Sequence, residues 1–196
     1  MGKVITHMTM SLDGYIADPD DQVGELFDWY QAGDVAVEHA NEELGEFRVD
    51  DASADVLEGM LKAPGALVAG RHLFDITNGW NDSHPTGAKV VVVTHEPPAD
   101  AGERWPNTTF VSGVAEAVAK AKELAGEQDV TIASANVIQQ ALDLGLVDEI
   151  AVSLVPVLFG EGKRYFGPLD RGHLMLDDPQ LVQGRRAVHM TFPVRR

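Results

Sequence analysis

The chemistry of this chain is most visible around Ser134, where a buried strand is expected to run into a helix. Val130–Ala133 is a short apolar run, and the apolar residues after Ser134 recur at helical spacing as far as Gly145. The first N–H groups of a helix have no partner within it, and they carry the positive end of its dipole. The sequence therefore predicts an anion site at this junction.

The overall charge limits which anions and surfaces could bind. The chain has 15 basic and 31 acidic residues, a formal net charge of −16. This charge argues against duplex nucleic acid or an anionic membrane as a partner. An anionic cofactor would need a local positive patch, for which the candidates are Arg71, His95, Lys163 and Arg164.

Composition narrows the class further. The chain has 196 residues and no cysteine, which favours one domain and excludes disulfides, thiolate metal sites and a cysteine nucleophile. Its seven histidines show no metal-ligand spacing, so no metal site is expected. The N-terminus lacks the apolar region of a signal peptide, and no apolar run is long enough to span a bilayer. We expect a soluble cytoplasmic protein.

Strands and helices alternate through the middle of the chain, and strands follow one another at its end. The expected strands are Val4–Met10, Ala66–Ala69, Lys89–Thr94, Thr108–Val111, Val130–Ala133 and Val147–Val157, with an antiparallel hairpin around Gly184 between Leu174 and Val194. The expected helices lie near Val35–Leu44 and Ser53–Leu61, just after Arg71, along Val114–Ala125, and after Ser134, with Ser53 as an N-cap and Tyr15–Glu25 as a loop. This order predicts an α/β protein with a mostly parallel sheet and an antiparallel C-terminal edge.

Several short motifs, in this order and spacing, carry a resemblance. They are Ser11–Ala17, Val68–Arg71, Gly79-Trp80, Val90–Thr94, Gly145–Glu149 and Pro156–Phe166. The chain resembles the dihydrofolate-reductase-like superfamily, in the branch that includes the reductase domain of riboflavin biosynthesis. The resemblance implies a three-layer fold over residues 1–196, with a helical insertion around residues 26–62.

The resemblance also implies NADPH across the C-terminal ends of the strands. Hydride would pass from the nicotinamide to a C=N or C=O bond of a small metabolite. The residues that would hold the cofactor are Gly70, Arg71, His72, Thr94, His95, Ser134, Ala135, Asn136, Val137 and Ile138.

Three residues are candidates for the substrate side. Asp13 would orient the substrate or relay a proton, as the catalytic residue, or would only cap its own turn. Trp80 would stack on a flat ring, or would belong to the core or to an interface. Glu161 would accept a hydrogen bond from a substrate hydroxyl or amine, or would be a solvated turn residue.

Three departures from the family pattern fall on cofactor positions. Leu73 replaces a threonine, His95 replaces an arginine, and Ser134-Ala135 replaces a pair of glycines. Weakened or altered NADPH affinity is expected, and loss of the arginine charge makes NADH possible.

These departures also leave other interpretations open. One is a non-catalytic ligand-binding or interaction protein on the same fold, and another is a flavin-dependent enzyme. Dihydrofolate is not the favoured substrate, because the acidic residue that it requires has only Asp28 as a nearby candidate. The riboflavin intermediate is disfavoured, because the accompanying deaminase motif is absent from this sequence. A homodimer is expected, with part of the apolar segment Val147–Phe159 at its interface.

Overall fold

A central sheet organises the computed structural model, which describes residues 2–40 and 45–195. Within those residues the sheet has eight strands, in the spatial order β11 (Gln180–Gln183), β12 (Val188–Pro193), β9 (Glu149–Val155), β1 (Val4–Ser11), β8 (Asp129–Ile132), β5 (Pro64–Gly70), β6 (Lys89–Val93) and β7 (Thr108–Val111). From β9 to β7 all neighbours are parallel, whereas β12 runs antiparallel to both β9 and β11. The predicted α/β class and C-terminal hairpin are confirmed.

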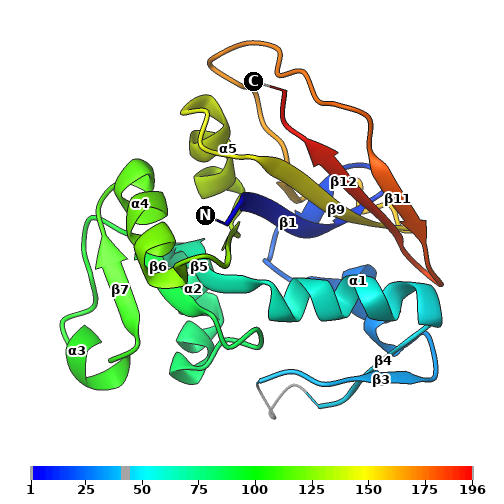
Figure 1. Cartoon of the computed structure of the whole chain (residues 1–196), viewed down its shortest axis with the longest axis horizontal. Helices are drawn as coiled ribbons and strands as arrows, with labels where there is room; N and C mark the ends of the chain where they lie inside the picture. Colours follow the sequence, from blue (N-terminus) through cyan, green and yellow to red (C-terminus); the bar gives the residue numbers. More distant parts are fainter. Residues whose placement is uncertain (1, 41–44, 196) are drawn as a thin grey trace.

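Helices cover both faces of the sheet, which gives three layers (Figure 1). On one face, α4 (Val114–Ala125) and α5 (Ala135–Asp143) pack on alternate strand residues such as Val68. The opposite face carries α1 (Asp51–Lys62), the 3-10 helix η1 (Gly24–Gln31) and α2 (Arg71–Ile76). Side chains alternate between faces along a strand, so the apolar run of β5 is buried on both sides.

The opposite face is divided between two apolar clusters. One lies under α1 and η1 and includes Trp29 and Leu57, and the other lies around Phe74 of α2 and Trp105. Ile5, His7 and Thr131, on the strands between them, belong to neither cluster and are only half-buried. We call these three residues the central strip. Polar or reactive groups placed there can reach a ligand, unlike those beneath the helices.

Short elements complete the fold. They are β2 (Tyr15–Ala17), which pairs with β10 (Lys163–Arg164), the hairpin β3 (Val35–Val37) and β4 (Phe47–Val49), the 3-10 turn η3 (Asn78–Asp82), and α3 (Ala101–Arg104). The β3–β4 hairpin reaches the loop before β6, where the N–H of Ala40 donates to the carbonyl of Pro85 at 2.8 Å.

Several sequence-based predictions between residues 15 and 62 were wrong. The helix expected near Val35–Leu44 is replaced at its start by β3, and residues 41–44 lie outside the described residues. Long-range pairing with β4 outweighs the local pattern of that segment. The segment around residues 26–62, expected to be a helical insertion, is therefore only partly helical, and Tyr15–Glu25 contains a strand as well as a loop.

Helix α1 begins earlier than predicted, and Ser53 is not its N-cap. Asp50 takes that position, and its carboxylate accepts hydrogen bonds from the N–H groups of Ala52 and Ser53 at 3.1 and 3.2 Å. The same carboxylate accepts the Ser53 hydroxyl at 2.8 Å and the N–H of Arg185 at 2.7 Å. Asp50 thus joins the start of α1 to the turn between β11 and β12.

The long apolar segment Val147–Phe159, part of which was expected at a dimer interface, has its strand edges occupied within the chain, and the interface itself stays a prediction. Its strand, β9, lies between β12 and β1, so its edges are already paired. Only the residues beyond the strand are open, and Leu158 is 68% exposed. Separately, no helix within residues 2–40 and 45–195 combines the length and apolarity needed to cross a membrane.

Replacing Asp50 by alanine should destabilise the fold by about 1–2 kcal/mol, because a helix cap is lost. Burial alone would raise the pKa of Asp50, but hydrogen bonds from Arg185, Ser53 and Ala52 outweigh it and lower the pKa. The stabilisation is therefore complete above the ordinary aspartate pKa of about 3.9 and is lost as the pH falls below it. Urea unfolding of wild type and Asp50→Ala at pH 7 and pH 3 measures both effects. A difference in stability that is as large at pH 3 as at pH 7 would contradict this assignment.

Candidate functional site

Parallel pairing brings three predicted site segments to the same edge of the sheet. Gly70, the last residue of β5, pairs with Val93, the last residue of β6. Thr94, the next residue after Val93, therefore lies at the same edge of the sheet as Gly70. On the other side of β5, Val68 lies beside Ile132, and the N–H of Ala133 donates to the Val68 carbonyl at 2.9 Å. The carboxyl ends of β5, β6 and β8 therefore meet, as the sequence predicted.

Gly70 and Ser134 are in direct contact at this edge. The N–H of Gly70 donates to Oγ of Ser134 at 2.9 Å. A Cβ atom at Gly70 would lie 3.3 Å from Cγ2 of Val137 and 3.4 Å from Ser134, so a larger residue would crowd the start of α5. The glycine keeps the backbones of β5 and α5 close together.

The first turn of α5 leaves N–H groups without a capping side chain. Ser134 is the N-cap residue, but its hydroxyl caps no N–H of α5, because it serves Gly70 instead. The first N–H that bonds within the helix is that of Ile138, which donates to the Ser134 carbonyl at 3.0 Å. Ala135, Asn136 and Val137 precede it, so their N–H groups can serve an anion. The strand-to-helix junction expected at Ser134 is present, and the anion site there stays a prediction.

Two of the predicted cofactor residues, Val137 and Ile138, have buried side chains that cannot contact a ligand. Val137 and Ile138 are 3% and 0% exposed and pack in the core beneath α5. Val137 can reach a ligand only through its backbone, and the N–H of Ile138 is already used by the helix. Ile138 therefore supports the site from below without a free donor.

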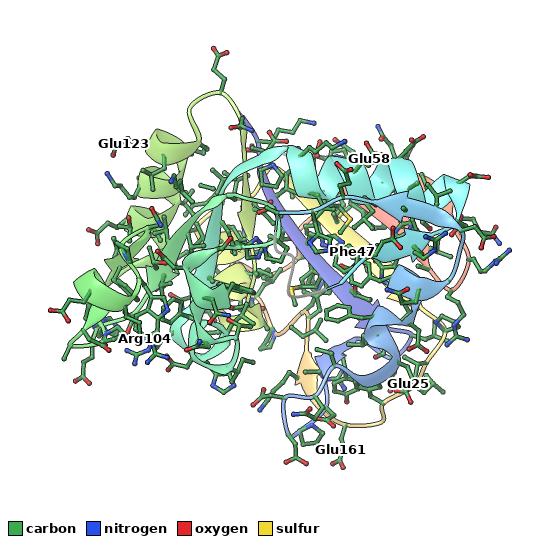
Figure 2. All side chains as sticks on the ribbon, turned by 90° about the horizontal axis from the view of Figure 1, so that it is seen from below. Glu25, Phe47, Glu58, Arg104, Glu123 and Glu161 are labelled. Carbon is green, nitrogen blue, oxygen red and sulfur yellow. The ribbon has the colours of Figure 1, made fainter. Side chains whose placement is uncertain are left out.

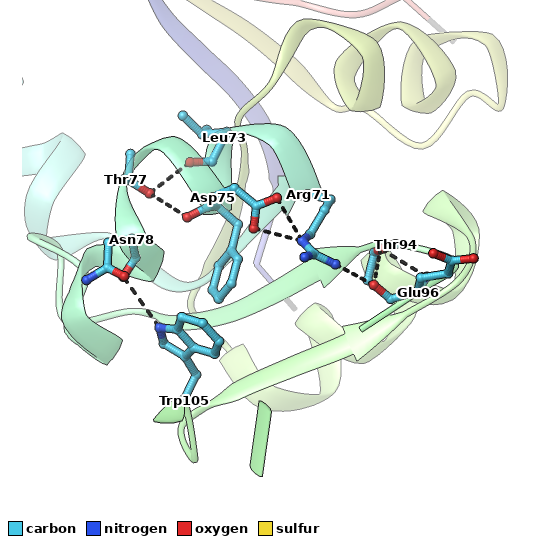
Figure 3. A network of polar contacts seen from close by, with 9 residues as sticks. Arg71, Leu73, Asp75, Thr77, Asn78, Thr94, Glu96 and Trp105 are labelled. Atoms are coloured by element: carbon cyan, nitrogen blue, oxygen red, sulfur yellow. Dashed lines mark hydrogen bonds and ion pairs between the residues drawn. The ribbon is translucent and has the colours of Figure 1, made fainter. Parts of the chain in front are cut away.

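The guanidinium of Arg71 is bonded to two neighbouring residues, Asp75 and Glu96 (Figure 3). Its Nε lies 2.8 and 2.9 Å from the two carboxylate oxygens of Asp75, and its Nη1 donates to the carbonyl of Glu96. Thr94 bonds the same carbonyl through its hydroxyl at 3.2 Å. Arg71 and Thr94 therefore converge on one loop, but the guanidinium shares its charge with an acidic neighbour.

The two predicted histidines differ in their position relative to that loop. His72 is on α2, and its Nε2 lies 2.9 Å from the carboxylate of Asp21, across the protein surface. His95 follows Thr94 and is exposed. Of the two, only His95 lies within the Thr94–Glu96 turn that Arg71 contacts.

Asp13 organises a turn instead of standing free. Its carboxylate accepts the Ser11 hydroxyl at 2.6 Å and the N–H groups of Gly160 and Phe159 at 2.7 and 3.2 Å. The hydrogen bond from Ser11, followed by those from Gly160 and Phe159, lowers the pKa of Asp13 to about 2. The group remains a carboxylate at neutral pH, so it can accept hydrogen bonds but has no proton to donate.

The structure does not bring Trp80 and Glu161 into contact with one another. Trp80 lies in η3, where the backbone of residues 78–82 has positive φ, and it packs partly against the apolar cluster of α2. Its ring meets that of His84 edge-on, with centroids 4.8 Å apart. Glu161 is exposed at the tip of the turn that Asp13 anchors, at the periphery of the molecule in Figure 2.

The sequence-based analysis missed His7, which lies in the central strip beside this edge. β8 pairs with β1 up to Ile132 and Thr6, so the chain leaves the sheet towards Ser134 next to His7. A detectable signal was the alternation of His7, Thr9 and Ser11, which places three polar side chains on one face of a central strand. No group of residues suited to hold a metal ion occurs among residues 2–40 and 45–195.

Comparison with known protein families shows which family the chain belongs to. The family described as the RibD C-terminal domain matches residues 2–183 of the chain. The chain belongs to this family. A search of curated proteins finds no match.

Solved structures of RibD-like and dihydrofolate-reductase-like proteins share the fold. A protein described as a riboflavin biosynthesis protein from Shewanella sp. PV-4 is 23% identical, with a TM-score of 0.67 and 99% of both chains covered. Dihydrofolate reductase from Enterococcus faecalis, in complex with NADP(H), is 16% identical, with a TM-score of 0.60, 100% of this chain and 98% of that one. The riboflavin biosynthesis reductase Rib7 of Saccharomyces cerevisiae is 12% identical, with a TM-score of 0.61, 99% of this chain and 90% of that one. The expected superfamily and its riboflavin-reductase branch are confirmed.

Ser134 is expected to affect stability through two opposing terms. Its φ of +79° suits glycine better than a residue with a Cβ, while its hydroxyl satisfies Gly70. Ser134→Ala keeps the backbone strain and loses the hydrogen bond, so it should destabilise by about 1 kcal/mol. Ser134→Gly also loses the bond but relieves roughly 1 kcal/mol of strain, and should be close to neutral. Urea unfolding measures both variants, and a glycine variant less stable than the alanine variant would contradict this account.

Proposed function

We propose that this RibD C-terminal domain protein is an NAD(P)H-dependent reductase that transfers hydride to a C=N or C=O bond of a small metabolite. Membership of the family and the shared fold support an oxidoreductase. The observation that carries the proposal is the uncapped first turn of α5, packed directly against Gly70.

The residues at this edge suit a dinucleotide in distinct ways. The N–H groups of Ala135, Asn136 and Val137 would donate to the diphosphate, and the Ser134 hydroxyl, which only accepts from Gly70, would add a further donor. Arg71 would bind a phosphate as a charged donor once it leaves Asp75. When bound, the cofactor would supply a hydride from its nicotinamide ring.

Residues of the chain would perform the remaining tasks. Asp13 holds the turn that carries Glu161, so both would border the substrate side without moving a proton from Asp13. Trp80, half-buried and adjacent to His84, would contact a flat substrate ring with its open side. His95 in place of an arginine leaves NADH as a second possible donor.

One observation favours the alternative, a ligand-binding or interaction protein on the same fold. Arg71 is already neutralised by Asp75 and bonded to the Glu96 carbonyl, which leaves less positive charge for a phosphate. A homodimer and a cytoplasmic location stay predictions, as does the absence of nucleic-acid and membrane partners.

Titration with NADPH and NADH, followed by cofactor fluorescence, tests the proposed function. We expect saturable binding of NADPH with a dissociation constant below about 1 mM, which corresponds to a binding free energy of at least about 4 kcal/mol. If neither dinucleotide binds in that range, the reductase function fails and the binding-protein alternative is left.

Arg71 and Asp75 should have opposite effects on NADPH affinity. Arg71→Ala should weaken binding by about 1.5–3 kcal/mol, because a charge-assisted phosphate bond is lost. Asp75→Asn should strengthen binding, because it frees the guanidinium, and the exposed pair itself adds only about 0–1 kcal/mol to stability.

Glu58→Gln is the matched control for Asp75→Asn. It removes a carboxylate from the Glu58–Lys62 pair, which has the same i,i+4 spacing on α1. The control should leave the dissociation constant unchanged, so that a gain specific to Asp75→Asn is not an effect of overall charge. An unchanged dissociation constant for Arg71→Ala removes Arg71 from the site.

A further inference from the structure

A continuous chain of hydrogen bonds runs from His7 to Asp50 across three strands. Nε2 of His7 lies 3.1 Å from Oγ of Ser153, which lies 2.9 Å from Nδ1 of His189. Nε2 of His189 lies 3.1 Å from Oγ of Ser53, whose hydroxyl donates to Asp50 at 2.8 Å.

The interior of this chain is shielded from solvent. Ser53, Ser153 and His189 are 0%, 1% and 5% exposed. Gly184 packs directly on Ser53, since a Cβ there would lie 2.0 Å from the Ser53 hydroxyl. Water therefore does not compete for the internal bonds, and each group depends on its two neighbours for partners.

The carboxylate at the end fixes the direction of every bond. Asp50 only accepts, because its hydrogen bonds lower its pKa despite burial. Ser53 uses its proton for Asp50 and must accept from Nε2–H of His189. Nδ1 of His189 then accepts from Ser153, which in turn accepts from Nε2–H of His7.

This order leaves Nδ1 of His7 without a proton. Among residues 2–40 and 45–195 it has no hydrogen-bond partner, and it is not among the enclosed side-chain atoms that lack one. His7 is half-buried in the central strip, and its Nδ1 is not fully enclosed by the protein. Burial, and then the nearby His189, lowers the pKa of His7 to about 4, which keeps the ring neutral.

From this geometry we propose that His7 is a specificity-determining residue whose Nδ1 accepts a hydrogen bond from an N–H or O–H group of a neutral substrate. This deepens, and rests on, the proposed reductase function, because His7 lies beside the point where β8 leaves towards Ser134. The substrate class is then a heterocycle or amide that presents a donor, in contrast to an acceptor-only carbonyl compound. Ser153, His189, Ser53 and Asp50 act as positioning residues, since they hold the tautomer.

The tautomers can be measured without substrate or cofactor. In the full chain labelled with 15N-histidine, long-range 1H–15N spectra should show His7 and His189 neutral and protonated at Nε2 between pH 6 and 8. Ser153→Ala should change the signals of both rings, while His173→Gln, on the exposed loop, should change neither. A charged His7 at pH 7, or one protonated at Nδ1, overturns the proposal.

Uracil and 1,3-dimethyluracil are the ligand probes, since they share a ring and differ in N–H donors. Uracil at 20 mM should shift the Nδ1 signal of His7, and the dimethyl compound should not. His7→Gln keeps a donor for Ser153 but lacks Nδ1, and should bind uracil about fivefold more weakly, the equivalent of one neutral hydrogen bond. An equal response to both probes, or none to uracil, overturns the acceptor role.

The NADPH titration tests the reductase function, and the histidine spectra test the assignment of His7. A protein that passes the histidine test but binds no dinucleotide keeps the His7 acceptor and loses the reductase function. A protein that binds NADPH but shows the wrong His7 tautomer keeps the reductase function and loses the assignment of His7.

Discussion

The parallel alignment of β5, β6 and β8 is the constraint on which the site depends. Because these strands end at one edge, Gly70, Thr94 and Ser134 lie at the same edge of the sheet although they are distant in sequence. The contact between Gly70 and Ser134 then holds the start of α5 against β5, with its first N–H groups uncapped. A chain with a net charge of −16 offers an anion little long-range attraction, so local donors must supply the binding.

The two faces of the sheet have different roles. The face under α4 and α5 is a continuous apolar core, which fixes the position of the helix N-terminus. The other face holds two apolar clusters separated by the half-buried central strip. Buried polar groups on that face are paired end to end, from His7 to Asp50, as burial requires. A dinucleotide at the edge and a neutral ligand over His7 would therefore lie side by side.

Much of the fold could be predicted from sequence because its signals are local. The β-branched run before Thr94 and the apolar stripe of α4 each indicate their element directly. The β3–β4 hairpin and the N-cap of α1 could not be predicted, because β3 is fixed by pairing with β4 and the capping residue Asp50 also bonds the distant Arg185. In the site, the residues at strand ends could be predicted, because parallel strands end at the same edge of the sheet. The Arg71–Asp75 pair and the role of His7 depend on side-chain partners that sequence spacing does not reveal.

A structure of the protein crystallised with NADPH is the most direct test of the central claim. We predict the diphosphate against the N–H groups of Ala135–Val137, with the Arg71 guanidinium turned from Asp75 towards a phosphate. The nicotinamide should then lie over the central strip, near His7. A dinucleotide bound elsewhere on the protein, with the first turn of α5 and the Arg71–Asp75 pair unchanged, would contradict the account.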